Sequence, residues 1–60
     1  MITNIVMHLR RENIDDLANI ARSLDASRKK IEHTLRNNPD IFKGERVIGS
    51  RGWLTLWRLQ

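Results

Sequence analysis

The sequence predicts an α+β fold in which three helices precede a C-terminal β-hairpin. Apolar residues recur with the helical period of about 3.6 up to residue 37, and with a period near two after residue 41. Pro39, which keeps the residue before it out of helical conformation, separates the two regions. The chain has 60 residues, 40% hydrophobic and 30% charged, which suits a single small domain over residues 1–60.

The first helix is expected over about residues 2–12. Its apolar stripe consists of Ile2, Ile5, Val6 and Leu9. His8 falls off this stripe and is expected on the polar side of the helix. Asn13 breaks the pattern, and Ile14 is expected as an isolated apolar residue in a connector.

Two shorter helices are expected next, over about residues 16–24 and 27–37. Asp15 or Asp16 can cap the first of them by accepting hydrogen bonds from free amides of its first turn. Its stripe consists of Leu17, Ile20, Ala21 and Leu24. Ser27 is a good N-cap for the next helix, whose expected buried pair is Ile31 and Leu35.

The hairpin is expected over about residues 41–59. Its first half is interpreted as two short strand pieces, 41–42 and 46–48, with a possible bend at 43–45. A turn at 49–52 follows, whose two glycines supply positive φ. Trp53 and Trp57 share one face of the last strand and are expected to pack, with Trp57 and Leu59 over the helices. Leu54 and Leu56 face the other way and form the candidate surface for a homodimer or a protein partner.

The segment from residue 20 to residue 35 has a small residue, Ala21, where two helices would cross, and Leu24 to close the first of them. Asp25 tolerates the left-handed conformation that the turn needs, Ala26 plugs the turn and Ser27 caps the next helix. This pattern resembles the helix-turn-helix of bacterial DNA-binding regulators. With the hairpin, residues 2–59 resemble a three-helix winged helix-turn-helix domain of the small fimbrial-operon or phage type, although the family usually has Gly at the position of Asp25.

Charge is distributed unevenly along the chain, whose net charge is +4. Residues 26–60 hold eight of the eleven Lys and Arg but only three of the seven Asp and Glu. A basic half on a small domain suggests a polyanionic partner, with nucleic acid as the first candidate.

The resemblance implies that the third helix lies in the major groove of duplex DNA and that the hairpin, the wing, lies on the flanking backbone or in the minor groove. Setting Ile31 and Leu35 inward points Lys29, His33 and Arg36 outward, with Lys30 and Glu32 beside them. The candidate DNA-binding residues are Ser27, Arg28, Lys29, Lys30, His33, Arg36, Arg46, Ser50 and Arg51.

No enzyme, cofactor, metal or small-molecule site is predicted. The chain has no Cys, His8 and His33 lie on different helices, and no Gly-rich phosphate loop is present. No apolar run has the length of a membrane span. The expected function is sequence-specific binding of double-stranded DNA by a small transcriptional regulator, cytoplasmic and associated with the nucleoid when DNA-bound.

Three alternatives remain open. A winged helix can also hold a protein partner, here through Leu54 and Leu56. The same residues would serve as the DNA-binding domain of a replication, recombination or excision factor. The two Trp residues could instead stack on RNA or single-stranded bases.

Overall fold

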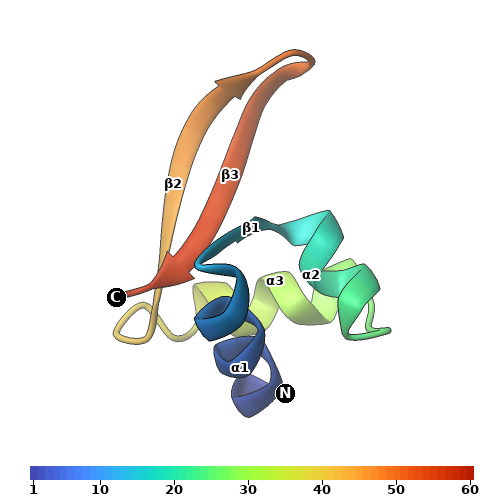
Figure 1. Cartoon of the computed structure of the whole chain (residues 1–60), viewed down its shortest axis with the longest axis vertical. Coiled ribbons are helices and arrows are strands. Elements are labelled where there is room, and N and C mark those ends of the chain that lie inside the picture. The colour runs from blue at the N-terminus through green and yellow to red at the C-terminus, as the bar shows by residue number, and fades with distance from the viewer.

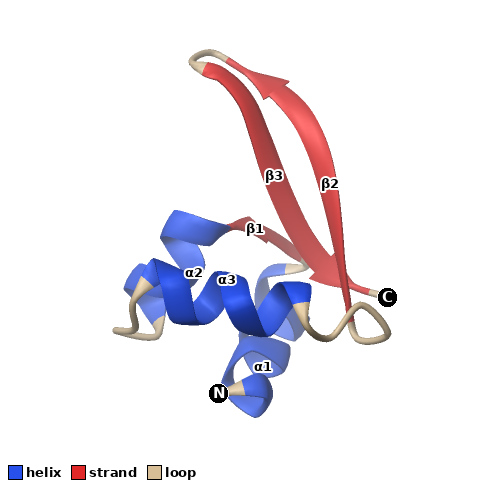
Figure 2. Ribbon diagram, turned by 180° about the vertical axis from the view of Figure 1, so that it is seen from behind, coloured by secondary structure: helices blue, strands red, loops and turns tan.

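The computed structural model describes residues 1–60 as three helices and one three-stranded antiparallel sheet (Figure 1). The elements are α1 (Ile2–Glu12), β1 (Ile14–Asp16), α2 (Leu17–Ser23), α3 (Arg28–Arg36), β2 (Phe42–Gly49) and β3 (Gly52–Leu59). The strand order is β1-β3-β2, so the hairpin strands are neighbours and β1 lies on the other edge of β3. The helices gather at one end of the sheet, and the hairpin extends away from them (Figure 2).

The core lies between the helices and the lower end of the hairpin. Its buried residues are Ile5, Leu9, Ile20, Ala21, Ile31, Leu35 and Phe42. Trp57 and Leu59 pack against this core from β3, as the sequence predicts. Ile2, the first residue of α1, remains 39% exposed, and the N-terminal end of this helix points away from the sheet (Figure 1).

Ile14 does not lie in an irregular connector, contrary to the sequence-based expectation. It begins β1, which pairs antiparallel with β3 from Ile14 opposite Arg58 to Asp16 opposite Leu56. Asn13, with φ of 69°, turns the chain between α1 and this strand. The expectation was wrong because the residues that pair with β1 lie 40–44 positions later in the chain, and three residues carry too little pattern to reveal a strand.

His8 is buried, although the helical pattern places it on the polar side of α1. Its Nε2 lies 2.7 Å from Oδ2 of Asp15, which β1 brings against α1. Nη2 of Arg11 lies 3.5 Å from the other ring nitrogen. The carboxylate accepts a hydrogen bond from the ring, so the polar groups that β1 buries are satisfied.

Opposing effects act on the Asp15 carboxyl. Burial alone would raise its pKa, but hydrogen bonds from His8, Asn19 and the Asp16 amide, together with the charge of His8, lower it. The net pKa lies below the usual value for an aspartate. The ionised carboxylate therefore joins α1, β1 and the start of α2.

The first strand of the hairpin is continuous, whereas the sequence suggested two pieces with a bend. Phe42–Gly49 pairs with Gly52–Leu59 residue for residue. Gly44 lies opposite Trp57, and a Cβ added at Gly44 would lie 3.0 Å from the indole ring. This glycine therefore makes room for Trp57 and does not bend the strand. At the turn only Gly52 has a positive φ, of 112°, so the expectation was wrong for Gly49.

The N-caps of α2 and α3 and the turn between these helices are as the sequence predicts. Oδ1 of Asp16 accepts a hydrogen bond from the Asn19 amide at 2.8 Å. Oγ of Ser27 accepts from the Lys30 amide at 3.2 Å. Asp25 has the left-handed φ of 52° that a tight turn between two helices requires. The cap at Ser27 fixes where α3 begins, and the backbone turn at Asp25 sets the direction in which the chain leaves α2.

Candidate nucleic-acid interface

The helix α3 has one apolar side and one charged side. Ile31 and Leu35 are fully buried. The exposed candidates on α3 are Arg28, Lys29, Lys30, His33 and Arg36. Because the buried pair holds the helix in the core, the charged side chains are free to contact a partner.

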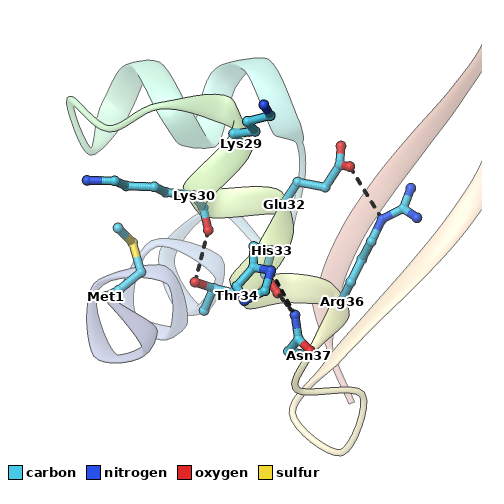
Figure 3. A pocket seen from close by; sticks show the side chains of 8 residues that line it. All are labelled: Met1, Lys29, Lys30, Glu32, His33, Thr34, Arg36 and Asn37. Carbon is cyan, nitrogen blue, oxygen red and sulfur yellow. Dashed lines mark hydrogen bonds and ion pairs between the residues drawn. The ribbon is translucent and has the colours of Figure 1, made fainter.

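The outer side of α3 borders an open groove of about 680 Å³ (Figure 3). Its lining consists of Met1, Lys29, Lys30, Glu32, His33, Thr34, Arg36 and Asn37. Lys30 extends toward Met1, whereas Arg36 extends in the opposite direction (Figure 3). The cationic groups therefore cover the width of the helix, a distribution that suits an extended polyanion better than a compact ligand.

The charges on this face are not equally free. Nε of Arg36 lies 3.6 Å from Oε1 of Glu32 one turn earlier. Both side chains are exposed, and an exposed pair of this kind is worth only a few tenths of a kcal/mol, about 0.3–0.5. Lys29 and Lys30 form no ion pair. The N-terminal half of the face thus has the least compensated positive charge.

The remaining candidates on this side, Ser27, Arg28 and His33, differ in their contacts within the chain. Asn37 donates to the backbone oxygen of His33 at 2.6 Å, and its amide nitrogen lies 3.2 Å from Nδ1 of the same residue. Ser27 is exposed, but its hydroxyl is used in capping α3. Arg28 is exposed at the first residue of α3 and does not line the groove.

The other three candidates lie on the hairpin. Ser50 and Arg51 form the exposed tip between β2 and β3, and Arg46 is exposed on β2. The hairpin rises away from the helices, so the tip and the α3 face are separate surfaces (Figure 1, Figure 2). The nine candidates therefore form two groups, six on or beside α3 and three on the hairpin.

The two Trp residues differ in environment despite their shared face. Trp57 packs against the core, whereas Trp53 is 65% exposed and is not part of the core. The guanidinium carbon of Arg46 lies 5.1 Å from the centre of the Trp53 ring. The sequence pattern did not reveal this contact, although Arg and Trp at diagonal positions of a hairpin are close enough to meet.

Leu54 and Leu56 lie on the opposite face of β3 from Trp57, as predicted. Leu54 is 41% exposed, and Leu56 is less exposed. Ile14 pairs with Arg58, two residues after Leu56 on the same face of β3, and adds a second exposed apolar residue to this outer face at 40%. The exposed large apolar residues of the outer face are therefore Leu54 and Ile14.

No family model, curated protein or solved structure matched this chain. None of the three helices is both long and apolar enough to cross a bilayer.

Proposed function

We propose that this protein binds double-stranded DNA through the outer face of α3. The observation that carries this proposal is the unpaired positive charge of Lys29 and Lys30 on a helix whose other side is held in the core by Ile31 and Leu35. The side chain of neither lysine forms a hydrogen bond or an ion pair within the chain. An exposed helix with this charge fits the major groove, which is about 12 Å wide.

In this arrangement Lys29 and Lys30 contact base edges or nearby phosphates at the start of the helix. His33 donates to a base or phosphate. Arg36 exchanges its exposed pairing with Glu32 for the backbone or for O6 and N7 of a guanine. Glu32 is then free to accept from N4 of a cytosine.

The hairpin supports the same mode of binding. Arg51 and Ser50 at the tip contact the flanking phosphates, and a narrow minor groove is especially attractive to Arg. Occupancy of a site in this way is the mechanism of a small transcriptional regulator, which acts in the cytoplasm on the nucleoid. We propose a binding role and no catalytic one.

The test is a titration of fluorescein-labelled duplex DNA of random sequence, read by anisotropy at several salt concentrations. Lys29→Gln with Lys30→Gln removes two charges from the α3 face. Arg10→Gln with Arg11→Gln removes two charges from α1 and is the matched control. If both lysines neutralise phosphates, the slope of log K against log salt falls by roughly 1.8 in the first double variant, at about 0.9 per contact.

Equal losses in the two double variants would show only a dependence on net charge and would contradict an interface on α3. Absence of salt-dependent binding by the folded natural chain would contradict duplex binding itself. Selection from a randomised duplex pool then tests sequence specificity, because a specific site competes successfully with random DNA and a non-specific one does not.

A protein-binding role is the second candidate, and the exposure of Leu54 and Ile14 on the outer face favours it. In that case the two lysine substitutions leave function intact. Leu54→Asp, on the strand face away from the core, would abolish it.

A further inference from the structure

The distal half of the hairpin, residues 46–55, stands clear of the helices (Figure 1, Figure 2). Strand β1 pairs only with residues 56–58 of β3, so this half has no sheet neighbour apart from its own two strands. It carries Trp53 at 65% exposure and Ile48 at 74%. One of the two Trp residues of a small chain is therefore placed in solvent, where it contributes little to the core.

The charge around Trp53 is exclusively positive. Residues 46–55 contain Arg46 and Arg51 and no acidic residue. The nearest acidic residue in sequence, Glu45, is engaged by Arg58 at 3.0 Å and by Lys43 at 4.0 Å. Arg46 forms no ion pair and instead lies over the Trp53 ring at 5.1 Å.

An exposed aromatic ring beside unpaired cations provides the two components by which proteins bind single strands. The ring stacks on a base, and the cations contact the phosphates on either side of it. The bases within a duplex have both faces covered by their neighbours, so this ring can stack only on a base that has left the stack. The chemistry favours an unpaired strand over an intact duplex at this position.

We propose that the distal half of the hairpin is a binding site for single-stranded nucleic acid, in which Trp53 stacks on an unpaired base and Arg46 and Arg51 contact the adjacent phosphates. This site shares Arg51 with the duplex contacts proposed for the hairpin tip, but it lies apart from the α3 face and does not depend on duplex binding there. A chain with both sites would prefer DNA in which a duplex adjoins an unpaired strand.

The experiment uses a fluorescein-labelled oligothymidylate of about 12 nucleotides, within the range of site sizes for small single-strand-binding domains. An abasic strand of the same length has the phosphates without the bases. Binding of each is measured by anisotropy at low salt for the natural chain and for Trp53→Ala, Trp53→Phe and Ile48→Ala. An oligouridylate arm distinguishes an RNA ligand from a DNA ligand.

We expect Trp53→Ala to weaken oligothymidylate binding by about 5- to 150-fold, which corresponds to 1–3 kcal/mol of stacking per base. Trp53→Phe retains most of the affinity because it keeps an aromatic face. Ile48→Ala, directly opposite Trp53 in register, changes the affinity less than twofold. The abasic strand binds the natural chain and Trp53→Ala equally.

Equal binding of the oligothymidylate by the natural chain and Trp53→Ala would overturn the proposal, and so would no binding by the natural chain. Sedimentation of the free protein tests the alternative that the apolar tip joins two copies of the chain. A dimer dispersed by Trp53→Ala, with no effect of this substitution on the oligonucleotide, would also overturn it. Should Trp53→Ala lose its circular dichroism spectrum, protection of the natural chain's Trp fluorescence from acrylamide by the oligonucleotide decides the question.

Loss of duplex binding in the lysine variants leaves these results unchanged, because Trp53 and the α3 face are tested with different ligands. The two proposals can therefore fail independently.

Discussion

Gly44 is the position where a single added methyl group tests the packing of the hairpin on the helices. A Cβ built there lies 3.0 Å and 3.1 Å from two carbons of the Trp57 ring and 3.2 Å from Cγ2 of Thr55. These distances are shorter than ordinary van der Waals contacts, and Trp57 is held from behind by the core. The change Gly44→Ala must therefore displace either the indole ring or strand β2.

Two effects of opposite sign determine the outcome. Replacing a strand glycine by alanine ordinarily stabilises a protein by about 0.5–1 kcal/mol, because the unfolded chain has less freedom to lose. Overpacking a filled site costs about 1–3 kcal/mol. We expect the second effect to prevail and the free energy of unfolding to fall by about 1–2 kcal/mol, from a total of about 3–9 kcal/mol for a chain of this size.

The assay is thermal unfolding followed by circular dichroism. A loss of this size lowers Tm by about 4–16 °C in a domain of this length. Gly49→Ala is the matched control on the same strand, because its φ is ordinary and its nearest atom, the oxygen of Gly52, lies 3.6 Å away. We expect its Tm to be unchanged or slightly raised.

Removing the ring tests the cause directly. In a Trp57→Leu background the clash with the ring is absent and only the close contact with Cγ2 of Thr55 remains, so Gly44→Ala should cost about 1 kcal/mol less, the size of a coupling between touching residues. A Tm for Gly44→Ala at or above that of the natural chain would refute the reasoning that Trp57 lies across this glycine.

Three further predictions concern stability. The pKa of Asp15 is lower in the folded chain than in the unfolded one. Its contribution to the free energy of unfolding is therefore complete above about pH 4 and is lost as the pH falls through the folded-state pKa. Urea unfolding at several pH values should show this loss in the natural chain and a smaller loss in Asp15→Asn. Ser27→Ala removes the acceptor for the Lys30 amide and should lower the free energy of unfolding, measured in urea, by about 0.5–2 kcal/mol. The control Ser23→Ala changes a serine that caps no helix and should lower it less. Equal losses in the two variants would exclude a capping role for Ser27. Asp25→Gly relieves the left-handed strain at φ of 52° and should raise the free energy of unfolding by about 0.5–1 kcal/mol, and a decrease would show that the Asp side chain itself stabilises the turn.

Much of the α3 face could be predicted from the sequence, because a helix with two known buried positions places every other side chain by geometry alone. Ile31 and Leu35 fix which residues of α3 point outward. The periodicity does not specify side-chain conformations. It therefore could not show that Arg36 pairs with Glu32, or that Lys29 and Lys30 form no ion pair. The contact of Arg46 with Trp53 requires the register of the hairpin, which only the paired strands define.

Features that depend on residues within about four positions of one another follow from the amino-acid sequence alone. The cap at Ser27, the turn at Asp25 and the reversal at residues 49–52 are of this kind, since each is made by neighbours along the chain. Long-range contacts decided the rest. Ile14 became part of a strand and His8 became buried only because β3 and Asp15 were brought beside them.

Trp53 and Trp57 show this division most clearly. Both lie on the same face of one strand, and the alternation of side chains cannot distinguish them. Trp57 packs against the core that the helices form, whereas Trp53 lies outside that core and is 65% exposed. The physical reason is that burial depends on how far the helical body reaches along the hairpin, a property of the assembled fold and not of the local sequence.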